Sequence, residues 1–221
     1  MTATMVRLWS GLAGVWLLAG GAAADESRRF TIDAAGSDVH WLVYKAGTLA
    51  RLGHNHVITV AELTGSVSTD GASPSASHFE LQFPVASLVV DDPKLRSGLG
   101  PDFSSVPSAD DVAGTRKNML SERVLMGDHF ATIRVSGQGP IGSADAQTLQ
   151  ITVELLGRSV ALTVPTKVEI SGDEVTASGE FELTHTTLGM TPFSVMLGAL
   201  QVADKMKFVY RIHATAAAPK N

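Results

Sequence analysis

An alternation of apolar and polar residues with a period of two constrains the fold of this chain more than any other feature. Residues 149–155 place four aliphatic side chains on one parity and Gln, Thr and Glu on the other. Successive side chains of a strand point to opposite faces, so the pattern predicts a strand with one buried face. The same pattern recurs in other segments: 30–33, 39–43, 79–85, 160–164, 175–183 and 205–213.

Short polar connections between these segments favour antiparallel hairpins, for example at Gly157-Arg158-Ser159 and Ser171-Gly172-Asp173. Regularly spaced antiparallel strands predict an all-β barrel or sandwich, and periodicity alone does not choose between them. A barrel of about eight strands is either packed solid or holds one small ligand. The inward residues of 175–183 include both Gly179 and Phe181, a mixture of sizes that a tapered core and a ligand cavity would both require.

Two segments interrupt the alternation. Residues 45–54 are predicted to hold a helical turn that leads into a strand from about His56. Residues 91–125 form a long polar excursion in which Ser108 is predicted to cap a short helical turn. A long loop in a compact domain is usually functional or mobile. The carboxylate pairs Asp91-Asp92 and Asp110-Asp111 are interpreted as solvated turns or helix starts.

Composition excludes several classes of function. The chain has no Cys, which removes disulfides, Cys-ligated zinc, iron–sulfur clusters and thiol nucleophiles. Lys and Arg number 17 against 22 Asp and Glu, a formal net charge of −5, which argues against nucleic acid as a partner. The sequence contains no Gly-x-Ser-x-Gly elbow, His-Glu-x-x-His helix or P-loop. We therefore expect a binding protein and not an enzyme.

The N-terminal residues are predicted to form a signal peptide. Arg7 is the only charged residue before Asp25, and an apolar run follows it over 8–21. The run ends at Ala22-Ala23-Ala24, so cleavage is expected between Ala24 and Asp25. An uncleaved membrane anchor, the alternative, would need about 20 apolar residues. The predicted boundaries are 1–24 for the signal peptide and 25–221 for a periplasmic domain.

Cleavage would remove one of the 17 basic residues and none of the 22 acidic ones, leaving a formal charge of −6. A surface with this charge is not suited to anionic membranes. No later segment is long and apolar enough to span a bilayer, so we expect no stable membrane insertion after cleavage. Without disulfides, the exported domain must be held together by apolar burial.

Four sets of segments, taken in order, carry a family resemblance. They are 30–33 (Phe-Thr-Ile-Asp) with 37–41 (Ser-Asp-Val-His-Trp), 116–120 (Arg-Lys-Asn-Met-Leu) with 128–133 (Asp-His-Phe-Ala-Thr-Ile), the paired strands of 149–164, and 184–190 (Thr-His-Thr-Thr-Leu-Gly-Met). Together they resemble the YceI-like family of exported lipid-binding proteins over nearly all of the exported domain. The resemblance implies a lipocalin-like antiparallel β-barrel with one or two short helices. It also implies a tunnel for a polyisoprenoid or an isoprenoid quinone.

A pair of histidines departs from the common family pattern. Gly53-His54-Asn55-His56 stands where many relatives carry one His, and it resembles a subgroup with a Gly-His-x-His motif. In an extended segment His54 and His56 point to the same side, a spacing compatible with a first-row metal. His185 is in phase with inward-facing neighbours, so a divalent-metal site of His54, His56 and His185 is the alternative hypothesis. An inward His could instead donate to a buried carbonyl or to a quinone oxygen.

Strand parity sorts the remaining histidines in the same way. His129 is in phase with the inward Ile133 and is expected to face the interior. Three others are out of phase with the apolar residues of their strands and are expected in solvent: His40, His78 and His213.

The expected function is therefore to bind and carry an apolar isoprenoid ligand, a lipid or a quinone. The alternatives are a His-based metal-binding protein and a structural barrel with a packed interior. The residues expected to line the tunnel are Trp41, Val43, Phe79, Leu81, Phe83, Ile151, Val153, Leu155, Phe181, Phe208 and Tyr210. The residues expected at its mouth are His54, His56 and His185.

Overall fold

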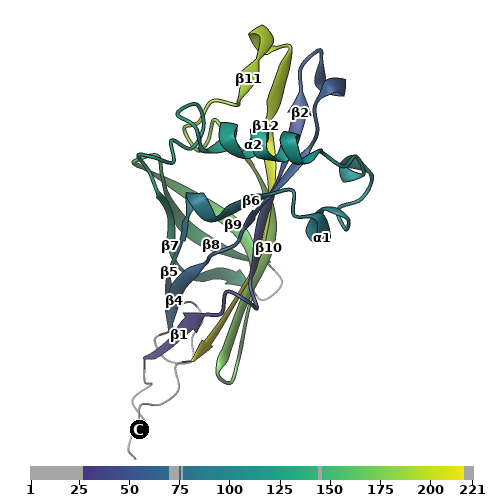
Figure 1. Ribbon diagram of the computed structural model, residues 1–221. Coiled ribbons are helices and arrows are strands. Elements are labelled where there is room, and N and C mark those ends of the chain that lie inside the picture. The colour runs from purple at the N-terminus through teal and green to yellow at the C-terminus, as the bar shows by residue number, and fades with distance from the viewer. Residues whose placement is uncertain (1–26, 70–74, 76, 144–145, 217–221) are drawn as a thin grey trace, which may run out of the picture.

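The computed structural model describes residues 27–69, 75, 77–143 and 146–216 of the chain. The expected signal peptide and its cleavage site lie outside the described residues, so that boundary stays a prediction. Strands form most of the described structure (Figure 1). They are β1 (Arg28–Ile32), β2 (Asp38–Ala46), β3 (His56–Val60), β4 (Thr64–Thr69), β5 (His78–Pro84), β6 (Leu88–Val90), β7 (Thr132–Ser143), β8 (Ala146–Leu155), β9 (Arg158–Ser171), β10 (Glu174–Thr184), β11 (Ser194–Val195) and β12 (Leu200–Ala216).

Eight of these strands close into an antiparallel barrel. Hydrogen bonding runs in the order β1-β4-β5-β7-β8-β9-β10-β12, and β12 pairs back with β1 to complete the ring. Closure leaves the ring without a free sheet edge. The expected lipocalin-like all-β barrel is therefore confirmed, and the sandwich is excluded.

The β8–β9 hairpin shows how the alternating sequence sets the register. Leu149 pairs with Val164, Ile151 with Leu162 and Val153 with Val160, so apolar side chains meet across the two strands. The turn between them consists of Leu156 and Gly157, both with positive φ (53° and 71°). A two-residue turn of this kind matches the twist of the flanking strands. A shift of one residue would turn every apolar side chain outward, so the apolar pattern fixes the register.

The long strand β12 divides one of its edges between two partners. Its residues 214–216 pair with β1, and its residues 201–211 pair with β2. β3 then pairs with β2, and β6 pairs with β3. These three strands therefore extend the wall beyond the ring at one end of the barrel, where Figure 1 also places α2 (Ala109–Leu120).

The outer face of β2 and β3 is buried, contrary to what its parity suggests. The chain from Asp91 to Ser108, with α1 (Pro93–Arg96) and a 3-10 turn at Pro101–Phe103, folds over this face. Phe103 packs there against Leu42 and Val57 in a second apolar cluster. His40 shares the outward parity of Leu42 and is only 5% exposed, so the expectation that it lies in solvent is wrong.

Helix α2 is longer than the short turn expected after Ser108. The Ser108 hydroxyl accepts from the Asp111 amide, and the Asp111 carboxylate accepts from the Ser108 amide, which forms a capping box. The charged residues 116–120 form the last turns of this helix and do not follow it. Asp110 and Asp111 therefore begin a helix, as expected.

His129 is the second histidine that parity misplaces. It lies in a turn in which its amide donates to the Met126 carbonyl, before β7 begins. Strand alternation does not extend into that turn, and the His129 side chain is 63% exposed beside Glu122. The expectation that it faces the interior is therefore wrong.

Candidate functional site

The barrel encloses an apolar cavity of about 630 Å³. Its wall comes mainly from inward-facing aliphatic and aromatic side chains of the barrel strands and of β2 and β3, with residues of α2 at one end. Ligand pockets commonly have volumes of about 300–1,000 Å³ and a mostly hydrophobic lining. The interior is thus not packed solid, which removes the main support for a purely structural barrel.

Every residue expected at the tunnel or its mouth lies on this cavity. The structure brings these fourteen side chains to one surface, because residues of equal parity on paired strands face the same side of a sheet. They are Trp41, Val43, His54, His56, Phe79, Leu81, Phe83, Ile151, Val153, Leu155, Phe181, His185, Phe208 and Tyr210. Their contact with a ligand stays a prediction.

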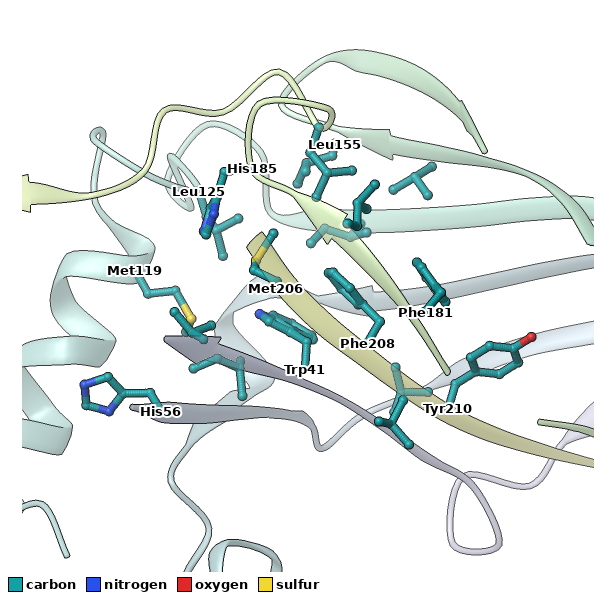
Figure 2. Close-up of a pocket in the computed structure, with 18 of the residues that line it drawn as sticks. Trp41, His56, Met119, Leu125, Leu155, Phe181, His185, Met206, Phe208 and Tyr210 are labelled. Carbon is teal, nitrogen blue, oxygen red and sulfur yellow. The ribbon is translucent and has the colours of Figure 1, made fainter. Parts of the chain in front are cut away.

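An aromatic band crosses three neighbouring strands of the wall (Figure 2). Phe208 on β12 stacks on Trp41 of β2, with ring centroids 5.7 Å apart, and on Phe181 of β10, at 5.3 Å. The register explains both contacts, since Phe208 pairs directly with Trp41 and with Phe181. Tyr210 meets Phe181 edge-on. The band forms a continuous aromatic part of the cavity wall.

Tyr210 lies next to this band and satisfies its hydroxyl within the barrel wall. Its Oη donates to the Pro165 carbonyl at 2.8 Å. Burial raises the pKa of the Tyr210 hydroxyl above its ordinary value. The hydroxyl therefore remains protonated at neutral pH and serves as a donor to the backbone.

A buried ion pair lies next to His56. His56 Nδ1 is 2.6 Å from Asp91 Oδ2, and Arg96 Nη1 is 2.6 Å from Asp91 Oδ1. The Val57 amide also donates to Asp91 Oδ1, at 3.0 Å. The side chains of Asp91 and Arg96 are 1% and 5% exposed. Asp91 is therefore not the solvated turn residue that its polar sequence context suggests.

The position of Asp91 depends on an uncommon backbone conformation. Its φ is +56°, in the left-handed region that non-Gly residues seldom occupy and that Asp and Asn tolerate best. Burial by itself raises the pKa of the Asp91 carboxyl. The hydrogen bonds from His56 and the Val57 amide, together with the nearby Arg96 charge, outweigh burial and hold that pKa below its usual value. Asp91 is thus a carboxylate at neutral pH.

His54 lies nearer the solvent than His56. Its Nε2 is 3.8 Å from Asp111 of α2, and its Nδ1 is 3.3 Å from the Ser105 hydroxyl. Hydrogen bonds from the Ser108 hydroxyl and amide lower the pKa of Asp111. The two imidazole centroids of His54 and His56 are 6.3 Å apart.

His185 approaches the cavity from a different element. It follows β10, is 6% exposed, and its Nδ1 donates to the Asp204 carbonyl at 2.9 Å. Figure 2 draws it apart from His56, with Met119 and Leu125 between the two in that view. Among the described residues, no group of three or more His, Asp or Glu side chains is arranged to hold a metal ion. The geometry of the described chain therefore gives the three-histidine metal hypothesis no support.

Sequence reasoning missed the polar residues that surround His56. Asp91 and Arg96 lie in a polar segment that reads as solvated, although Arg96 ends α1, and Thr115 lies on a helix expected to be shorter. The sequence offered one signal for Asp91, which directly follows the apolar run 88–90. That run forms β6, so Asp91 begins next to a strand of the wall and not in a solvated loop. The sequence contains no comparable signal for Arg96.

Fold and cavity together define a class: a closed antiparallel barrel that surrounds an apolar, ligand-sized cavity with polar groups at one end. The model of the YceI-like domain matches residues 30–214, and the chain belongs to the YceI-like family. Membership in a Gly-His-x-His subgroup stays a prediction. By sequence alone, no curated protein matches the chain.

Solved structures share the fold at low sequence identity. The crystal structure of BcnA from Burkholderia cenocepacia is 13% identical with a TM-score of 0.61, covering 83% of this chain and 99% of its own. A polyisoprenoid-binding domain from Saccharophagus degradans is 10% identical with a TM-score of 0.55, covering 85% and 98%. A YceI protein from Campylobacter jejuni is 8% identical with a TM-score of 0.52, covering 73% and 85%. At these identities the likeness establishes the fold.

Helices in the described part of the chain are too short or too polar to cross a bilayer. The longest of them, α2, has 12 residues.

Proposed function

We propose that this protein is an exported carrier that holds an isoprenoid lipid, either a polyisoprenoid or an isoprenoid quinone, inside its barrel. The apolar cavity inside the barrel carries the proposal. Burying apolar surface away from water contributes a favourable free energy of about 25 cal/mol per Å². Such a cavity can therefore retain a long hydrocarbon chain without specific polar contacts. Family membership and the polyisoprenoid-binding domain among the similar structures support this ligand class. The proposal is for binding without catalysis.

The rim of the cavity supports a carrier role. Large apolar side chains at two neighbouring hairpin tips are exposed there: Leu52 in the turn Ala50–Leu52, and Met196 and Leu197 in the turn Met196–Gly198. The tips lie against each other, since the Leu49 amide donates to the Ala199 carbonyl. Leu52 itself lines the cavity. A ligand leaving another apolar phase would meet these side chains first.

Export to the periplasm is part of the same proposal and rests on residues 1–24. N-terminal sequencing of the protein recovered from its native host checks this part directly. We expect the mature chain to begin at Asp25, and a periplasmic fraction without the protein would contradict export.

The binding proposal is tested by extracting the natively purified protein with organic solvent and analysing the extract by mass spectrometry. We expect an isoprenoid at close to one equivalent. The variant Ala177→Phe inserts a ring into the cavity, because Ala177 lines it, and should carry much less ligand. The matched control Ala161→Phe places the same ring on the exposed face of the neighbouring β9 and should carry the wild-type amount.

Equal ligand content in the two Phe variants would contradict binding inside the barrel. An empty wild-type protein that also fails to gain thermal stability from added polyprenol or quinone would refute the proposal altogether, because a ligand that binds only the folded state must stabilise it.

A further inference from the structure

His56 ends a hydrogen-bonded chain that starts at the buried Arg96, in the segment that covers the outer face of β2 and β3. Arg96 donates to Asp91, and Asp91 in turn accepts from His56 Nδ1. The far ring nitrogen, Nε2, lies on the side of α2, where the Thr115 hydroxyl is 3.4 Å away. Both His56 and Thr115 line the cavity. Figure 2 draws His56 near Met119 of α2 and far from Tyr210.

The chain fixes which ring nitrogen of His56 carries the proton. The Asp91 carboxylate only accepts hydrogen bonds, so Nδ1 must be the N–H that points at it. In a neutral imidazole this leaves an unprotonated Nε2 on the side of α2, which is able to accept a hydrogen bond. At 3.4 Å the Thr115 hydroxyl is too distant to be a strong partner for that lone pair.

Arg96 does not give this mouth a positive charge. Its guanidinium is buried and donates its hydrogen bonds to Asp91 and to the carbonyls of Asn55 and Ser105. The cavity lining contains two carboxylates, Asp110 and Asp111. Its one Lys or Arg side chain among the described residues is Lys45, whose Nζ donates to the Gly53 carbonyl.

These charges separate two kinds of isoprenoid headgroup. A phosphate or diphosphate needs Lys, Arg or a cluster of N–H donors, and here it would face two carboxylates instead. A neutral hydroxyl needs one acceptor, which His56 Nε2 supplies. We propose that the His56 end of the cavity selects isoprenoids whose headgroup is a neutral hydroxyl, an alcohol or a quinol, and discriminates against phosphorylated isoprenoids. The inference rests on the proposed function, because it assumes that an isoprenoid occupies the barrel.

Two variants of His56 separate the roles of its nitrogens. In His56→Asn the amide takes the place of Nδ1 and can still donate to Asp91, but nothing replaces Nε2. In His56→Gln the amide reaches the place of Nε2 and restores an acceptor there. The exposed His78 on β5, which does not line the cavity, provides a control as His78→Asn.

Three probes with the same isoprenoid chain test the headgroup at pH 8. They are geranylgeraniol, geranylgeranyl diphosphate and the corresponding hydrocarbon, each titrated by calorimetry in detergent-matched buffer. For wild type and His78→Asn we expect the alcohol to bind about tenfold more tightly than the hydrocarbon, the worth of one satisfied hydrogen bond. The diphosphate should bind at least about tenfold more weakly than the alcohol.

The preference for alcohol over hydrocarbon should vanish in His56→Asn and return in part in His56→Gln, while hydrocarbon affinity stays within about twofold in all variants. If His56→Asn does not fold, it shows no thermal transition. The test then rests on the comparison of wild type with His56→Gln and on the affinity of wild type for the diphosphate. Wild type that binds the diphosphate as tightly as the alcohol overturns the inference, and so does His56→Asn with an intact preference. Wild type that binds none of the three probes refutes the proposed function itself.

Discussion

Replacing Arg96 by Met would leave the Asp91 carboxylate buried without its counter-charge. Arg96 makes four hydrogen bonds, one to Asp91, one to the Asn55 carbonyl and two to the Ser105 carbonyl. Removing one partner of a buried ion pair costs about 3–5 kcal/mol. For a domain of this size each kcal/mol lowers Tm by about 2–4 °C, so Tm should fall by about 6–20 °C.

Urea unfolding at pH 7, followed by circular dichroism, measures this cost. The double variant Arg96→Met with Asp91→Asn buries no charge, so it should be more stable than Arg96→Met alone. Arg134→Met is the matched control: Arg134 forms an exposed ion pair with Glu154, and its loss should cost less than about 1 kcal/mol.

The free energy of unfolding depends on pH through the Asp91 carboxyl. The pKa of Asp91 is lower in the folded state than in the unfolded chain, so its carboxylate stabilises the fold above the unfolded pKa of about 4. That stabilisation is lost as the pH falls through the lower, folded pKa. The cost of Arg96→Met should therefore shrink below about pH 4. A cost under about 1 kcal/mol at pH 7, or strictly additive effects of the two substitutions, would refute a coupled buried pair.

Three further predictions concern other parts of the barrel. Ser108→Ala removes the cap of α2 and should cost about 0.5–2 kcal/mol in urea unfolding, whereas an unchanged midpoint would show that the capping box does not matter. Gly179→Ala should destabilise the fold by about 1–3 kcal/mol, because its Cβ would lie 2.4 Å from the Pro165 carbonyl oxygen. Equal Tm values for the variant and wild type would mean that β9 moves away without loss of stability. Leu197→Ser should leave Tm within about 1 °C, since the side chain is fully exposed. It should also slow transfer of bound lipid to vesicles in a fluorescence assay, and an unchanged rate would exclude the rim from the transfer step.

Much of the ligand cavity could be predicted from sequence. The alternation in 149–155 and 175–183 assigns each side chain to a face, and a strand obeys that assignment wherever it lies in the barrel. This is why residues as distant in sequence as Trp41 and Phe208 were expected on one surface and are in fact stacked there. The expectation fails where the chain leaves the strand conformation, as at His129.

Contacts between segments that are far apart in the sequence could not be predicted from the alternation of apolar and polar residues. Parity states that His40 points away from the barrel interior, but it carries no information about the segment that covers the outer face. The hydrogen bond between His56 and Asp91 likewise joins residues 35 positions apart, and it depends on the uncommon φ at Asp91. Neither contact leaves a periodic signal in the sequence.

The sequence by itself therefore determined the strands, their inward faces and the apolar character of what they surround, because these depend on residues two positions apart. Only the tertiary structure decided that β12 shares one edge between β1 and β2, and that the loop from Asp91 to Ser108 covers the barrel wall. For the polar residues of this loop the physical reason is that a buried charge is stable only beside its partners, which lie far away in the sequence or in irregular segments. Folding alone brought Arg96, Asp91 and His56 together, and with them the polar end of the cavity.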